Sequence, residues 1–102
     1  MEINKAISNQ NVIFAIKGRL DTMTAPQLQE EINNTSLDDV ETVTLNMREL
    51  EYISSSGLRV IMALYKSLNN SGGNLKIVNV SSAIMELFKM TGMADYLDIE
   101  KA

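Results

Sequence analysis

The sequence predicts a single α/β domain, residues 1–102, in which a mixed sheet of four or five strands is packed with about three helices. Short apolar segments alternate along the chain with longer segments whose apolar residues recur at helical spacing. Each predicted helix is followed by a predicted strand, which implies crossover connections between mostly parallel strands. A chain of 102 residues, 45% of them hydrophobic, is the size of one globular domain.

Three segments are predicted to form the centre of the sheet. Val12–Gly18 and Asn74–Val80 are rich in β-branched residues, and Val43–Met47 alternates apolar with polar side chains. Two weaker strands are expected near the ends of the chain, at Ile3–Ala6 and Tyr96–Ile99. The first of these is expected to form a hairpin with the strand that follows it, across the segment SNQN.

The first helix is predicted from Ala25 to about Asn34. Thr24, followed three residues later by Gln27, fits a capping box, in which the threonine hydroxyl accepts a hydrogen bond from the first turn of the helix. Pro26 is compatible with that turn, where a backbone N–H would have no partner within the helix.

Two further helices have readable boundaries. The second begins within three consecutive serines, Ser54, Ser55 and Ser56, continues with apolar residues at helical spacing, and ends at the segment NNSGG. The third begins at Ser81 or Ser82 and ends at the Thr-Gly pair that follows its last apolar residues. The serine run therefore lies at the N-terminus of a helix, directly after an apolar segment.

Charge and hydropathy exclude several classes of function. The net charge is −4, the thirteen acidic residues are spread along the chain, and no basic cluster could follow a phosphate backbone, so direct nucleic-acid binding is not expected. The longest apolar run, Val12–Ile16, is too short to span a membrane, and the N-terminus lacks the pattern of a signal peptide. We therefore expect no membrane span, and the cytoplasm is the default location.

Neither a metal site nor a cofactor site is predicted. The chain contains no cysteine and no histidine, which removes thiolate and imidazole ligands. The densest acidic group, Asp38, Asp39 and Glu41, lacks the alternating oxygen ligands and the glycine of a calcium loop, and we interpret it as a solvated turn before a strand.

The serine run allows a structural and a functional interpretation. One serine is an ordinary helix N-cap, but three exceed what capping requires, and the others would expose hydroxyls at a helix end that suits anions such as phosphate. A hydrolase is not expected, because the nucleophile elbow needs a glycine where this chain has Ile53 and because no histidine is available as a base. We therefore predict no enzyme activity and no catalytic residue.

Four segments of the chain resemble segments of one known family. GRLDTMTA (18–25) is similar to a family segment of the form G-x-L-D-x-x-T-A. YISSSGLRVIM (52–62) is similar to the family's phosphorylation motif, while LNMREL (45–50) and KIVNVSSAIMELFKMTGM (76–93) resemble the units around it. The resemblance, which runs through nearly the whole chain in one order, is to the STAS domain of bacterial anti-sigma factor antagonists.

The resemblance implies a phosphorylation site at Ser55, with Ser54 and Ser56 as minor candidates. The chain departs from the family pattern at two positions, where Ser54 replaces a common aspartate and Arg59 replaces a common glycine. Arg59 lies one helical turn after Ser55, close enough in principle to pair with a phosphate there. A solvent-facing role for Arg59 is an equal alternative.

The resemblance also implies a function without catalysis. An antagonist of this family, when unphosphorylated, sequesters an anti-sigma factor that is also a serine kinase, and so releases a sigma factor. Phosphorylation by that kinase breaks the complex, and a phosphoserine phosphatase restores the unphosphorylated antagonist. The alternative within the same family is an accessory subunit of a lipid-transport ATPase complex. The residues expected at the partner-binding surface are Asp21, Thr22, Ser54, Ser55, Ser56, Gly57, Leu58 and Arg59.

Overall fold

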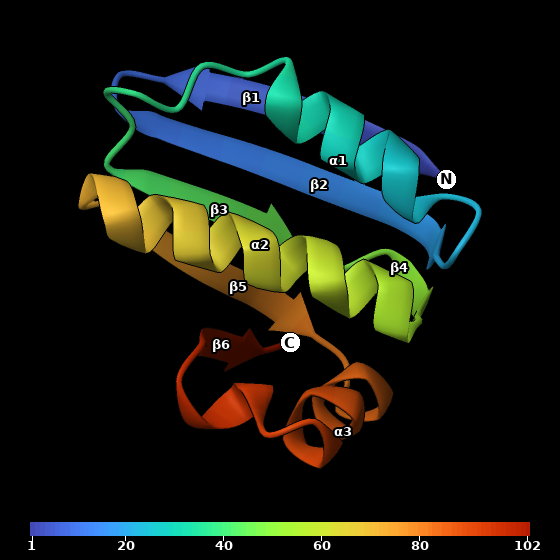
Figure 1. Cartoon of the computed structure of the whole chain (residues 1–102). Helices are drawn as coiled ribbons and strands as arrows, with labels where there is room; N and C mark the ends of the chain where they lie inside the picture. Colours follow the sequence, from blue (N-terminus) through green and yellow to red (C-terminus); the bar gives the residue numbers. More distant parts are fainter.

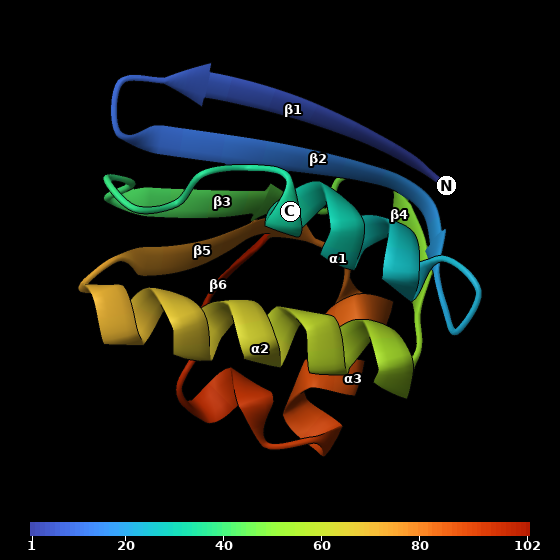
Figure 2. The ribbon, with the colours of Figure 1, turned by 45° about the horizontal axis from the view of Figure 1, so that its top comes forward.

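A single twisted sheet forms one layer of the protein, and the helices pack against one face of it (Figure 1). The computed structural model describes all 102 residues. Figure 2 shows the helices gathered on the same side of the sheet. In chain order the elements are β1 (Glu2–Ser8), β2 (Asn11–Leu20), α1 (Ala25–Asn33), β3 (Thr42–Asn46), β4 (Leu50–Ile53), α2 (Ser55–Ser71), β5 (Asn74–Val80), α3 (Ser82–Met90), the 3-10 helix η1 (Met93–Asp95) and β6 (Asp98–Lys101).

The predicted mixed sheet is confirmed. Its main path runs in the order β1-β2-β3-β5-β6, and β4 pairs separately with β2. Only β1 is antiparallel to its neighbour, in a hairpin whose last pair is Ser8 with Asn11, as the segment SNQN predicts. The remaining pairs are parallel, as expected for strands joined by helical crossovers.

Strand β2 changes partner along its length. Its first half pairs with β3 as far as Ala15, and from Gly18 onward it pairs with β4. The register shifts between Gly18 and Arg19, and Gly18 has a φ of +101°, which a residue with a side chain rarely adopts. This bend turns the end of β2 toward the N-terminus of α2, where the serines lie.

Strand β4 is the element that the sequence pattern did not reveal. The sheet has six strands rather than four or five because Leu50–Ile53 pairs with the end of β2. Its outer residues, Leu50 and Ile53, are buried, whereas the two between them, Glu51 and Tyr52, are exposed. Such a short segment has no period of two, so the pairing with β2 decides its conformation.

The capping box predicted at Thr24 is wrong. The Thr24 hydroxyl donates to the carbonyl of Arg19 at 2.7 Å and accepts from the N–H of Asp21 at 2.8 Å, so it makes no cap bond to α1. The Gln27 amide donates instead to the carbonyl of Met1 at 3.2 Å. The loop before the helix competes for the threonine, and local hydrogen bonds of this kind are typical of Ser and Thr in turns.

The serine caps of the other two helices are confirmed. The Ser54 side chain accepts from the N–H of Gly57, and the Ser81 side chain accepts from the N–H of Ile84 at 3.2 Å. Helix α2 ends at Ser71, and the left-handed backbone of Gly72 caps it, as the segment NNSGG predicts. Each cap satisfies one of the N–H groups that a helix leaves unpaired in its first turn.

One hydrophobic core lies between the sheet and the helices. Phe14 of β2, Ile61 of α2 and Phe88 of α3 are fully buried there, as are the inward residues of β3 and β5. None of the helices combines the length and the apolar character needed to cross a bilayer.

The first turn of α2 packs very closely against the ends of β2 and β4. A Cβ atom at Gly57 would lie 2.7 Å from Cγ of Leu20 and 3.0 Å from Cγ1 of Ile53. Real Cβ atoms do not approach other atoms to within 2.7 Å, so only glycine fits this contact without displacing a fully buried leucine.

The change Gly57→Ala is expected to destabilise the fold. Overpacking of a dense site costs about 1–3 kcal/mol, whereas the higher helix propensity of alanine returns at most about 1 kcal/mol. The midpoint of urea unfolding should therefore fall. In a Leu20→Ala background the approach to Leu20 is absent and only the 3.0 Å approach to Ile53 remains, so Gly57→Ala should cost less there. An equal cost in both backgrounds would show that the contact with Leu20 is not the cause.

Candidate functional site

The junction between β4 and α2 is held by Ser54. Its backbone is extended, with φ −99° and ψ 174°, and its side-chain oxygen accepts from the N–H of Gly57 at 3.4 Å. Its own N–H donates to the carbonyl of Leu20 at 2.9 Å, which ties the start of α2 to the end of β2. Both polar groups of Ser54 are thus committed to the fold, and the residue is half-buried.

Ser55 differs from the serines on either side of it. It is the first residue of α2 and is exposed, and its hydroxyl makes no hydrogen bond within the chain. The capping role is already filled by Ser54, so the Ser55 hydroxyl is free to react or to bind. The surrounding first turn of α2 contains no acidic residue that would repel an anion.

Ser56 brings a second segment of the chain to the site. Its hydroxyl lies 3.1 Å from the hydroxyl of Thr22, which is 34 residues earlier in the sequence. Thr22 belongs to the loop between β2 and α1. The predicted partner-binding residues from the two segments are therefore next to one another in the structure.

Asp21 shapes the loop that carries Thr22. Its carboxylate accepts from the N–H groups of Met23 at 3.0 Å and Thr24 at 3.2 Å, and from the Thr24 hydroxyl at 3.2 Å. The Nε atom of Arg19 lies 3.9 Å from the Oδ2 atom of this carboxylate. The carboxylate thus has several hydrogen-bond donors within its own loop. These bonds explain why Asp and Thr are three residues apart, and no bound ligand is needed to explain the spacing.

These contacts set the ionisation of Asp21. Desolvation acts to raise the pKa of this carboxyl, but the hydrogen bonds from Thr24 and Met23 and the charge of Arg19 together bring the pKa below its ordinary value. A lowered pKa means that the carboxylate stabilises the folded loop at pH values above its unfolded pKa. That contribution is lost as the pH falls through the lowered pKa.

Arg19 and Tyr52 form a contact beside the site that the sequence did not reveal. The Arg19 guanidinium lies 4.4 Å from the centre of the Tyr52 ring, and the side chains come from β2 and β4. Stacking of this kind stabilises exposed pairs modestly. Only the pairing of β4 with β2 brings the two residues together, so no local motif could have predicted the contact.

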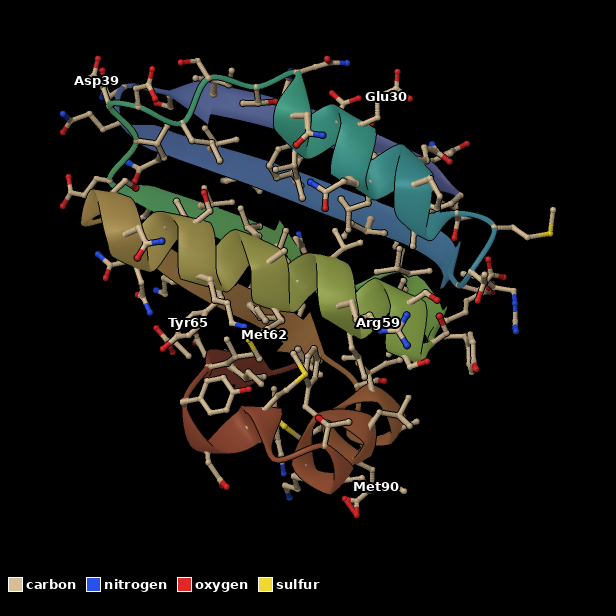
Figure 3. All side chains as sticks on the ribbon, in the orientation of Figure 1. Glu30, Asp39, Arg59, Met62, Tyr65 and Met90 are labelled. Carbon is tan, nitrogen blue, oxygen red and sulfur yellow. The ribbon has the colours of Figure 1, made fainter.

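A groove of about 300 Å³ begins at Ser55 and runs along α2 toward η1. Figure 3 shows Arg59, Met62 and Tyr65 along α2, with Met62 and Tyr65 on the side toward α3 and η1. Arg59 is the only charged residue in the lining. The groove is lined by Ser55, Leu58, Arg59, Met62, Thr91, Met93 and Tyr96.

The predicted site residues thus take different positions in one small region. Thr22, Ser55 and Arg59 are exposed, and Asp21 is half-buried in the loop. Gly57 is buried in the contact between α2 and β2, and Leu58 is 9% exposed at the edge of the core.

Two further exposed residues were not predicted as part of the site. Met23, at the tip of the loop between β2 and α1, is 90% exposed, and Tyr52 is 38% exposed. Single exposed apolar side chains are common on protein surfaces, so these two residues do not by themselves mark a binding surface.

Comparisons with known proteins agree with this geometry. A protein-family model described as the STAS domain matches residues 2–102. An anti-sigma-B factor antagonist from Bacillus subtilis is 32% identical over 97% of this chain and 92% of its own length. A protein of the same description from Staphylococcus aureus is 29% identical over 99% of this chain and 95% of its own length.

Solved structures show the same fold at lower sequence identity. An anti-sigma factor antagonist from Mycobacterium paratuberculosis superposes with a TM-score of 0.87 at 20% identity, covering 99% of this chain and 86% of the other. The phosphorylated form of the Bacillus cell fate determinant SpoIIAA superposes with a TM-score of 0.75 at 19% identity, covering 96% and 90%. Together with the match over residues 2–102, these findings show that the chain belongs to the STAS domain family.

Proposed function

We propose that this protein is an anti-sigma factor antagonist whose binding is switched by phosphorylation. In its unphosphorylated form it sequesters an anti-sigma factor that is also a serine kinase, and so releases a sigma factor. Phosphorylation by that kinase breaks the complex, and a phosphoserine phosphatase removes the phosphate again. The relatives that match over nearly the whole chain are described as anti-sigma-B factor antagonists, which supports this function.

The proposal assigns the phosphate to Ser55. The observation that carries it is the division of roles among the three serines. Ser54 is engaged as the helix cap and Ser56 contacts Thr22, whereas the Ser55 hydroxyl is exposed and unbonded. Ser54 and Ser56 remain minor candidates because a kinase would have to break existing contacts to reach them.

The partner-binding surface in this proposal is the end of the molecule where α2 begins. Its exposed residues would contact the kinase directly, while the buried glycine and the cap hold the surface in shape. Asp21 contributes by fixing the loop that presents Thr22. The residues assigned to this surface are Asp21, Thr22, Ser54, Ser55, Ser56, Gly57, Leu58 and Arg59.

The protein acts in this scheme as substrate and ligand, with no catalysis of its own. Its place of action is the cytoplasm, with the anti-sigma factor as partner and without direct contact to nucleic acid. An accessory subunit of a lipid-transport ATPase complex is the alternative with the same fold. The descriptions of the relatives favour the regulator over that alternative.

Electrostatics explains how one phosphate could break the complex but spare the fold. A phosphate on Ser55 adds about 1.5 to 2 negative charges at pH 7. The N-terminus of α2 tolerates that charge, because the unpaired N–H groups there carry partial positive charge. At an interface the same group must lose its water without a matching cation from the partner, so the penalty falls on binding.

The first test of this proposal concerns the modified residue. When the protein is incubated with its cognate kinase and ATP, one phosphate is expected, and mass spectrometry should map it to Ser55. The change Ser55→Ala should abolish incorporation, while Ser54→Ala and Ser56→Ala should retain it. Phosphate mapped mainly to Ser54 or Ser56 would contradict the assignment.

The second test concerns affinity for the kinase. Phosphoserine at position 55, or Ser55→Asp, should raise the dissociation constant roughly 30-fold or more, because an unmatched charge at an interface costs about 2–5 kcal/mol. Isothermal titration calorimetry would measure the affinities. The melting temperature of the free protein should change little, since the added charge lies on an exposed helix end.

The matched control is Ser55→Ala, which removes the hydroxyl without adding charge. It should bind like the unmodified protein, because Ser54 and not Ser55 caps α2. Equal affinities for the unmodified and the phosphorylated protein would place Ser55 outside the interface.

A further inference from the structure

Arg59 is an uncommitted cation in the groove that begins at Ser55. The ion pairs within the chain join Lys5 to Glu31, Lys17 to Glu49 and Arg19 to Asp21, and Arg59 takes part in none of them. Arg59 is exposed and is the only charged residue among those that line the groove. The remaining lining groups are apolar side chains, hydroxyls and a phenol, which offer no competing positive or negative charge.

The helix directs this cation toward Ser55. The two residues are separated by four positions on α2, so they lie one above the other on the same face. The Cα–Cβ bond of a helical residue tilts toward the helix N-terminus, and a long side chain covers the turn before its own Cα. Arg59 therefore covers the turn to which Ser55 belongs, and both residues line the same groove.

We propose that Arg59 is an intramolecular clamp for a phosphate carried by Ser55. This inference rests on the proposed function, which makes Ser55 the phosphoacceptor. The planar guanidinium can donate two parallel N–H bonds to two phosphate oxygens. Asp21, an acid of the neighbouring loop, does not compete, because its carboxylate already accepts from Met23 and Thr24.

The clamp gives Arg59 a regulatory role. By neutralising part of the phosphate charge within the chain, it limits the charge that a partner would meet at this surface. The strength of the switch then depends on residue 59, and a variant without the cation should release its partner more completely on phosphorylation. Because the pair is exposed, its effect is modest and should be screened by salt.

The ionisation of the phosphate tests the clamp directly. Phosphoserine is placed at position 55 during translation, so that no kinase is needed, and phosphorus NMR follows the second ionisation near pH 6. A nearby cation favours the dianion, so the midpoint should lie about 0.2–0.7 pH units lower in the Arg59 protein than in Arg59→Gln. This difference should shrink at 1 M salt.

Lys66→Gln is the matched control. Lys66 is also an exposed cation of α2, and it lies about three turns from Ser55. Its loss should leave the midpoint unchanged, and Arg59→Lys should give an intermediate value, because a lysine retains the charge but not the planar fork. Arg19 and Asp21, the charges of the neighbouring loop, are present in every variant and cancel in the comparison.

The same midpoint in the Arg59 protein and in Arg59→Gln would overturn the clamp. So would an equal shift in Lys66→Gln, since it would show a general effect of net charge. Failure of the clamp and failure of the proposed function can be told apart. If the kinase did not modify Ser55, the antagonist switch would be refuted while the NMR result stood. Conversely, an unshifted midpoint would refute the clamp while the affinity switch still held.

Discussion

The close contact between the first turn of α2 and the end of β2 is the constraint on which the site depends. Gly57 allows it, because any Cβ at that position would lie 2.7 Å from Cγ of Leu20. The N–H of Ser54 adds a 2.9 Å hydrogen bond to the Leu20 carbonyl, so the helix is fixed in position as well as packed. The bend of β2 at Gly18 and the pairing of β4 with the end of β2 also position this contact. Together they hold the start of α2 beside the loop that follows β2.

Three chemically identical neighbours acquire three different roles from this arrangement. Ser54 is half-buried and caps the helix, Ser56 contacts Thr22 of the adjacent loop, and Ser55 alone keeps a free hydroxyl at the surface. A capped helix does not need the middle serine, so that residue can be modified without loss of a structural hydrogen bond. The arrangement thus separates the one exposed, unbonded hydroxyl from the two serines that make structural contacts.

The charges around the site would favour an added phosphate within the chain itself. The first turn of α2 contains no acid, and the pKa of Asp21 in the neighbouring loop is lowered because hydrogen bonds from that loop outweigh desolvation. Arg59 is a free cation in the adjoining groove. An added phosphate would meet partial positive charge within the chain, whereas a partner pressed against it would have to supply its own compensation. The free-energy cost of the phosphate would therefore fall mainly on binding to a partner and not on the stability of the fold.

Local patterns in the sequence predict the α/β class, the serine caps of α2 and α3, and the strands and helices that have strong periodicity. These features depend on interactions within a few residues, which the local pattern records. The folded structure sets the remaining features. It made β4 a strand, diverted the Thr24 hydroxyl from α1 to Arg19, and brought Thr22 to Ser56 across 34 residues. The first and the last result from contacts between segments distant in sequence, whereas the Thr24 bond results from competition among hydrogen-bond partners within one loop. None of the three leaves a periodic trace in the chain.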